Sequence, residues 1–315
     1  MKKIFLFIAL AGSFTSMAQK KAVNPKPYAA TITEADLKKQ LYIIASPEME
    51  GRETATEGQR KAAAYIEDQF KTFGLLPGNN GNYQMQFPVF KDTFLSARVA
   101  INGTDLQINQ DFQPIIQINN NATQYFSEVV FAGHGIVDSG YNDYADLDVK
   151  GKAVLVLDGA PSSFKPTKTG FMSPAGAYAK LMNARNKGAI AMLMVGPGFP
   201  RRGLATSGNM YVNLYKASQM PNAFFISEKA AEQIIGGDWA SVKEKAKKEK
   251  VQGSTIKVNT LLDYQKKVNM LESSNVMGII EGSDKKDEWL ILTAHYDHLG
   301  KRGDVIYYGA DDDGS

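Results

Sequence analysis

The sequence contains no cysteine and only three histidines, His134, His295 and His298. Without a thiol, the chain has no disulfide framework, no cysteine-ligated zinc finger, no thiol nucleophile and no N-terminal cysteine for a lipid anchor. The scarcity of histidine restricts metal and acid–base chemistry as well. Any such site must use one of these three imidazoles or rely on carboxylates.

An excess of charge of either sign is also missing. The 36 Lys and Arg residues nearly balance the 33 Asp and Glu residues, and the formal net charge is +3. This balance gives no electrostatic case for nucleic acid as a partner. The chain is nevertheless 43% hydrophobic, which excludes wholesale disorder, and its 315 residues suit two modest domains or one domain with an insertion.

Long hydrophobic runs are missing too, apart from a short one at the N-terminus. Residues 1–18 begin with two lysines after Met1, continue with an apolar run over residues 4–11 and end in the small-residue pattern Ser16-Met17-Ala18. The apolar run is too short for a membrane span, which needs about 20 residues. The pattern predicts a cleaved secretory signal, and therefore export to a bacterial periplasm or beyond.

The rest of the chain shows alternating helix and strand patterns. Thr33 is a predicted helix N-cap, and apolar residues recur at helical spacing over residues 63–73. Residues 83–118 show the alternation of β-strands, and residues 128–260 alternate short apolar strands with helices. This order of elements predicts an α/β protein.

Residues 289–294 are apolar at nearly every position, which predicts a central strand covered on both faces. They run directly into His295, and ligands sit at the carboxyl ends of strands in open α/β sheets. His295 and Asp297 are two residues apart and share a face of an extended segment, so the carboxylate could hold the imidazole in one tautomer. A strand-end histidine that only caps a turn fits the same pattern.

Three adjacent carboxylates, Asp311-Asp312-Asp313, follow shortly afterwards. They repel one another unless they are solvated or meet a cation. An acidic surface turn and a calcium loop are both compatible with the run. A carboxylate can also bridge two metal ions about 3.5–4 Å apart. The position shortly after a His-x-Asp pattern favours this last interpretation.

These motifs together carry a family resemblance. Residues 294–300 and 309–315 resemble the start of the metal site of the MH-clan zinc exopeptidases and, more narrowly, of the aminopeptidases of peptidase family M28. Residues 45–52, with the Ala-rich helix that follows, resemble the N-terminal part of the same family. Residues 128–260 resemble a protease-associated (PA) domain, which many family members insert into the catalytic domain.

The resemblance implies an α/β fold: a phosphorylase/hydrolase-like zinc exopeptidase domain, with a mixed sheet flanked by helices, and an inserted α+β PA domain. The expected organisation is a signal peptide (1–18), the first part of the catalytic domain (19–127), the PA domain (128–260) and a truncated continuation of the catalytic domain (261–315). The family pattern continues with a Glu-Glu pair, an Asp and a second His, which cannot be placed in this chain. We therefore expect an N-terminal fragment that is inactive and poorly stable by itself.

The resemblance also implies roles for single residues. His295 would ligate one zinc ion, Asp312 would bridge two zinc ions, and Asp297 would orient His295, while the general-base Glu is not in the chain. His298 is expected to be structural or to line the entrance to the site, and Asp311 has no assigned role. The implied function is that of an exported zinc-dependent metallopeptidase, an aminopeptidase that hydrolyses N-terminal residues from peptides with a metal-activated water.

Other functions stay open from the sequence. A glutaminyl cyclase or carboxypeptidase relative would differ mainly in residues that this chain does not contain. A non-catalytic binding protein could keep the fold and lose the metals, although the intact His295, Asp297 and Asp312 argue against this. The inserted domain could itself be a peptide-binding lid, and His134 within it is not expected to be a ligand. The sequence makes no prediction of oligomeric state.

Overall fold

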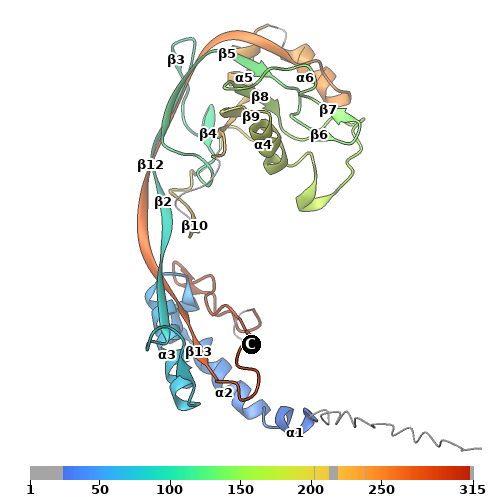
Figure 1. Ribbon diagram of the computed structural model, residues 1–315. Helices are drawn as coiled ribbons and strands as arrows, with labels where there is room; N and C mark the ends of the chain where they lie inside the picture. The colour runs from blue at the N-terminus through green and yellow to red at the C-terminus, as the bar shows by residue number, and fades with distance from the viewer. Residues whose placement is uncertain (1–23, 202, 213–218, 238, 313–315) are drawn as a thin grey trace, which may run out of the picture. The chain divides into compact units, whose positions relative to one another are not determined.

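The computed structural model describes residues 24–201, 203–212, 219–237 and 239–312. The chain divides into two compact units, shown in Figure 1. Unit 1 comprises Met1–Leu76 and Gly278–Ser315, and unit 2 comprises Pro77–Met277. Each unit is described by itself below.

The signal peptide predicted over residues 1–18 lies outside the described residues and stays a prediction. In the part of the chain that is described, no helix combines the length and the apolar character needed to cross a membrane.

Residues 26–72 of unit 1 form helical elements, and the sequence predicts two of them, α2 and α3. The helices described there are α1 (Lys26–Ala29), α2 (Glu34–Ile44), the 3-10 segment η1 (Pro47–Arg52) and α3 (Glu57–Thr72). The Thr33 hydroxyl accepts the Asp36 backbone N–H at 3.2 Å, which confirms the predicted N-cap of α2. After α3, Gly74 has a φ of 74°, a left-handed conformation that glycine adopts without steric cost.

The C-terminal part of unit 1 contains little regular structure. β13 (Gly278–Ile279) pairs with β1 (Leu76–Pro77), and β14 (Lys301–Arg302) pairs antiparallel with β15 (Val305–Ile306). The prediction of a buried central strand over residues 289–294 is wrong. These residues form neither strand nor helix, and Trp289 and Leu290 are 73% and 87% exposed. A central strand needs a hydrogen-bonded neighbour at each edge and apolar cover on both faces, and no described strand pairs with this segment.

Unit 2 is built on a mixed sheet. Its strands are β2 (Gln84–Ile101), β3 (Thr104–Asp105), β4 (Phe112–Pro114), β5 (Ala122–Phe131), β8 (Ala153–Leu157), β9 (Ala191–Val195), β10 (Ser207–Tyr211), β11 (Asn222–Ile226) and β12 (Ser254–Val276). Their order is β10-β2-β12-β5-β8-β9-β11-β4, with β3 paired to β2. The neighbours β5, β8, β9 and β11 are parallel and the other pairs are antiparallel. The predicted mixed α/β class is therefore confirmed.

Helices of unit 2 follow the parallel strands. They are α4 (Ala177–Asn186), α5 (Glu228–Ile235) and α6 (Trp239–Lys248), with a short 3-10 turn η2 (Gly170–Met172) before α4. The Ser227 hydroxyl accepts the Ala230 backbone N–H at 3.2 Å, as expected of the predicted cap of α5. The sequence predicts a helix capped by Ser227, with the lysine-rich residues 243–250 on its exposed face. They lie instead on and after α6, because α5 ends at Gly236, which has a φ of 86°.

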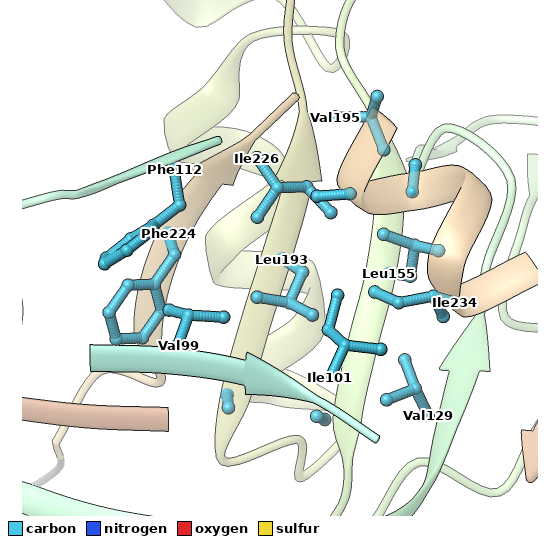
Figure 2. Close-up of a cluster of buried hydrophobic side chains, with 14 of the residues drawn as sticks. Val99, Ile101, Phe112, Val129, Leu155, Leu193, Val195, Phe224, Ile226 and Ile234 are labelled. Carbon is cyan, nitrogen blue, oxygen red and sulfur yellow. The ribbon is translucent and has the colours of Figure 1, made fainter. Parts of the chain in front are cut away.

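The core of unit 2 lies on both faces of the parallel strands. β8 and β9 are buried at all five positions each. Alternate side chains point to opposite faces of a strand, so Leu155 and Leu193 meet Ile234 of α5 on one face (Figure 2). On the other face, Met192 belongs to a second cluster with Leu181 of α4. Burying each such side chain stabilises the fold by roughly 1.5–3 kcal/mol.

Two long strands, β2 and β12, lie between β10 and the parallel strands of the sheet. β12 pairs antiparallel with β2 along the whole length of β2, from Thr260 opposite Ile101 to Val276 opposite Gln84. A smaller hairpin, β6 (Val137–Asp138) with β7 (Tyr141–Asn142), lies outside the large sheet. The predicted domain boundaries after residues 127 and 260 fall within β5 and β12, and they stay predictions.

Candidate metal-binding site

The His295 ring faces the carboxylate that lies two residues further along the chain. Its Nδ1 is 3.2 Å from Asp297 Oδ1 and 3.1 Å from the Asp297 carbonyl oxygen. When Nδ1 carries the proton and donates it to either oxygen, the lone pair of the ring resides on Nε2, the atom that then binds a metal. This is the contact that the predicted orienting role of Asp297 requires, and the role itself stays a prediction.

A hydroxyl from the N-terminal part of unit 1 holds the second oxygen of Asp297. Thr54 donates from Oγ1 to Asp297 Oδ2, so each oxygen of the carboxylate has a partner. The His295 side chain is 64% exposed and that of Asp297 35% exposed, which places the pair at the surface of unit 1. Sequence reasoning missed Thr54, because nothing in a single sequence links it to a carboxylate 243 residues away.

Asp312, the predicted bridging ligand, lies beside His298. Its Oδ2 is 3.8 Å from His298 Nδ1, and the His298 side chain is only 10% exposed. Gly309 packs against this ring, and a Cβ at that position would come within 2.6 Å of two ring carbons. The structure thus brings Asp312 to the histidine that the sequence assigned no ligand role. Asp311 is exposed, and Asp313 lies outside the described residues.

Arg52 connects the segments that carry these side chains. It is fully buried, at 0% exposure. Its Nε donates to the Tyr296 carbonyl oxygen at 2.7 Å, and its Nη1 donates to those of Ile44 at 2.6 Å and Tyr308 at 2.8 Å. Its Nη2 donates to the Gly309 carbonyl oxygen at 3.1 Å. Sequence reasoning placed Arg52 in a family-like segment and gave it no role, since these acceptors come from three separate parts of the chain.

Backbone hydrogen bonds join residues 51–53 to residues 298–300. The His298 N–H donates to the Arg52 carbonyl oxygen at 3.1 Å, and the Gly300 N–H donates to that of Gly51 at 2.8 Å. Glu53 forms a parallel bridge with His298. Gly51 has a φ of 68°, and a Cβ there would lie 2.4 Å from the Gly300 carbonyl oxygen, so only glycine permits this close approach.

The donor types at this site fit zinc, but the described set is incomplete. Imidazole nitrogen and carboxylate oxygen are both ordinary zinc ligands, and zinc takes three or four protein ligands. Among the described residues, no three His, Asp or Glu side chains gather closely enough to hold a metal ion. The predicted ligands His295 and Asp312 therefore supply part of a zinc site, and their assignment stays a prediction.

The remaining histidine belongs to the core of unit 2. His134 is buried, with Nδ1 3.2 Å from the Asp158 carbonyl oxygen and Nε2 3.1 Å from that of Ala246. Burial lowers the pKa of His134 below its usual range, because the apolar surroundings disfavour the imidazolium. Both ring nitrogens face backbone carbonyl oxygens.

Comparison with known protein families gives a match in part of each unit. Residues 275–315 match Peptidase family M28, and residues 116–234 match the PA domain. The chain carries M28 peptidase sequence and a PA domain. The family resemblance inferred from the motifs is thereby confirmed. The M28 segment includes His295, Asp297 and Asp312, and the PA domain lies within unit 2.

Solved structures that the chain matches include an aminopeptidase from Aneurinibacillus sp. strain AM-1, at 18% identity over 89% of this chain and 55% of that one, with a TM-score of 0.39. BSAP, a zinc aminopeptidase from Bacillus subtilis, matches at 17% identity over 88% and 54% of the two chains, with a TM-score of 0.33. A Peptidase M28 precursor from Shewanella amazonensis SB2B matches at 15% identity over 89% and 56%, with a TM-score of 0.32. The chain spans about half the length of these structures. Among curated proteins, no significant match is found.

Proposed function

We propose that the protein is an exported, zinc-dependent metallopeptidase that removes N-terminal residues from peptides. One observation carries the proposal: the segment that matches Peptidase family M28 contains His295 and Asp297 in hydrogen-bonding geometry. An imidazole held by a carboxylate at one nitrogen is the usual arrangement of a zinc-binding histidine.

The chemistry follows from this donor set. Zinc, when bound, polarises the scissile carbonyl group and lowers the pKa of a coordinated water. In the proposal, His295 would hold zinc through Nε2, Asp297 would fix the orientation of that ring, and Asp312 would supply a carboxylate ligand shared by the metal site. The described residues provide fewer ligands than zinc needs.

Two substitutions test the site in the protein expressed from its complete reading frame. Asp312→Asn removes the charge of the bridging carboxylate and should abolish binding of two zinc ions. Asp297→Asn leaves the ligands in place but weakens the support of His295, so aminopeptidase activity should fall about 10- to 100-fold with the metal largely retained. Zinc content is measured by elemental analysis. Activity is measured as turnover of aminoacyl nitroanilides and short peptides.

Asp304→Asn is the matched control, because Asp304 is an exposed aspartate between β14 and β15. It should bind zinc and turn over peptides as the unsubstituted protein does. Unchanged zinc content and activity in both Asp312→Asn and Asp297→Asn would overturn the site assignment. A protein that binds peptides without metal or turnover would instead be a non-catalytic relative. Release of free C-terminal residues, or cyclisation of N-terminal glutamine, would replace the aminopeptidase proposal with one of its enzymatic alternatives.

Export is the second part of the proposal, and it rests on residues 1–18. Cleavage after Ala18 would make Gln19 the first residue of the mature protein. N-terminal sequencing of the protein from the periplasm or the medium of a bacterial host checks this directly. A cell-retained protein that keeps Met1 would contradict it.

A further inference from the structure

The segment from residue 51 to residue 54 contacts every part of unit 1 that carries a proposed site residue. Its backbone accepts hydrogen bonds from His298 and Gly300, its Arg52 side chain reaches Tyr296, and its Thr54 side chain reaches Asp297. This segment is not part of the residues that match Peptidase family M28. We call residues 51–54 the positioning segment.

Arg52 donates hydrogen bonds to backbone carbonyl oxygens. A guanidinium has five N–H donors in a planar fork, so one side chain can bind several carbonyl oxygens in fixed directions. Here the fork joins the carbonyl oxygen of Tyr296, which lies between His295 and Asp297, to those of Tyr308 and Gly309. A buried charge without such acceptors is strongly unfavourable. The loops therefore have one favourable arrangement, in which all these carbonyls face Arg52.

Thr54 acts on a side chain. Its hydroxyl donates to Asp297 Oδ2 while Asp297 Oδ1 faces His295 Nδ1. The hydroxyl thus restricts rotation of the carboxylate, and the carboxylate restricts rotation of the imidazole. The result is a chain of three side chains that ends at the proposed zinc ligand.

We propose that Arg52 and Thr54 are positioning residues of the metal site: Arg52 fixes the distance between the two loops that carry His295 and Asp312, and Thr54 fixes the His295 ring through Asp297. The proposal rests on the proposed zinc-dependent function. Both residues act through the backbone and side-chain groups that they hold, before any metal binds.

The first experiment compares Thr54→Val with Thr54→Ser. Valine keeps the shape of threonine and loses the hydroxyl, whereas serine keeps the hydroxyl, and Thr72→Val on the exposed end of α3 is the matched control. Zinc affinity of the complete protein is measured by competition with a chromophoric chelator. Thr54→Val should weaken affinity about 10-fold, while Thr54→Ser and Thr72→Val should stay close to the unsubstituted protein. In turnover, kcat should fall with KM little changed.

A readout without metal separates this proposal from the proposed function. The three histidines of the chain can be labelled with nitrogen-15, and the ring shifts of His295 report which nitrogen carries the proton. In the metal-free protein, Thr54→Val should shift the His295 ring signals toward a mixture of tautomers. The signals of His134, in unit 2, should not move.

Arg52→Lys tests the backbone role, with Arg60→Lys on the exposed face of α3 as its control. Lysine keeps the charge and loses the fork, so it cannot reach all the carbonyl oxygens at once. Zinc affinity of the folded protein should fall about 10- to 100-fold. If Arg52→Lys does not fold, Arg52 is only structural, its positioning role is overturned, and Thr54 alone remains as a positioning residue.

The outcomes are distinct. Unsubstituted protein that binds no zinc would overturn the proposed function, and unmoved His295 signals in Thr54→Val would overturn the positioning role. Zinc-binding protein in which Thr54→Val keeps both its affinity and its His295 signals refutes the present proposal while leaving the metallopeptidase intact. Loss of stability alone, with unchanged affinity in the folded fraction, would show that Arg52 is only structural.

Discussion

β8 in unit 2 and residues 289–294 in unit 1 share an apolar sequence pattern and end in opposite environments. β8 is buried at every position, whereas Trp289, Leu290, Ile291 and Leu292 are each at least 73% exposed. β8 lies between two parallel neighbours, β5 and β9, and side chains from α4 and α5 cover its two faces. Among the described residues, no strand pairs with residues 289–294.

The difference shows that an apolar run specifies a strand only together with its partners. Every backbone N–H and C=O of a buried strand needs a hydrogen-bonding partner, because leaving one unpaired costs about 1–3 kcal/mol. Burial of apolar side chains stabilises the fold by about 25 cal/mol per Å² of buried surface. It also requires a second surface against which the strand can pack. β8 meets both conditions within unit 2.

The largest expected effect comes from a matched pair of leucine truncations. Leu155→Ala in β8 removes a side chain that is fully buried, and it should lower the free energy of unfolding by about 2–5 kcal/mol. Leu290→Ala removes one that is 87% exposed, and it should change the free energy of unfolding by less than about 0.5 kcal/mol. Urea unfolding of the two variants measures the difference. Equal losses would show that residues 289–294 are buried in solution.

A second prediction concerns the charge buried beside β8. Lys180 on α4 is fully buried, and its Nζ donates to the carbonyl oxygens of Leu157 and Gly159 at 2.5 Å each. Burial lowers the pKa of Lys180 to about 8. Between this value and the unfolded value of about 10.4, the unfolded chain binds a proton that the folded chain has lost, so stability due to Lys180 rises with pH.

Lys180→Met removes this dependence. The difference in unfolding free energy between unsubstituted protein and variant should grow as pH rises from about 8 to about 10.4, by at most about 1.4 kcal/mol per pH unit, and should be flat below pH 8. Contributions of tyrosines with raised pKa cancel in this difference. Lys165→Met, at an exposed lysine, is the control. A difference that stays flat or shrinks across this range would mean that folding does not lower the pKa of Lys180.

The smallest expected change in stability comes from the two tryptophans. Trp239 of α6 is 7% exposed and Trp289 is 73% exposed. Trp289→Phe should alter the free energy of unfolding by less than about 0.5 kcal/mol and leave a blue-shifted emission that iodide quenches weakly. Trp239→Phe should leave a red-shifted emission that iodide quenches strongly. Similar quenching of the two variants would contradict the assigned environments.

Much of unit 2 was predictable from local patterns. The apolar strands 153–157 and 191–195, the cap at Ser227 and the glycine after α4 carry their structure in a few adjacent residues. The same reasoning failed at residues 289–294, where the pattern was right for a strand and the partners were not among the described residues. It also merged α5 with α6, although the adjacent glycines Gly236 and Gly237 lie between the two helices.

At the candidate site, the sequence by itself determined the chemical groups. His295, Asp297 and Asp312 were identified from their spacing and from the family resemblance, and the contact between His295 and Asp297 is local enough to follow from that spacing. Only the tertiary structure decided what supports them. Arg52 and Thr54 lie more than 240 residues away from Tyr296 and Asp297, to which they donate hydrogen bonds, and Asp312 lies beside His298. Local patterns carry the propensities of neighbouring residues, whereas these contacts exist only once the chain has closed a long loop and buried a guanidinium among carbonyl oxygens.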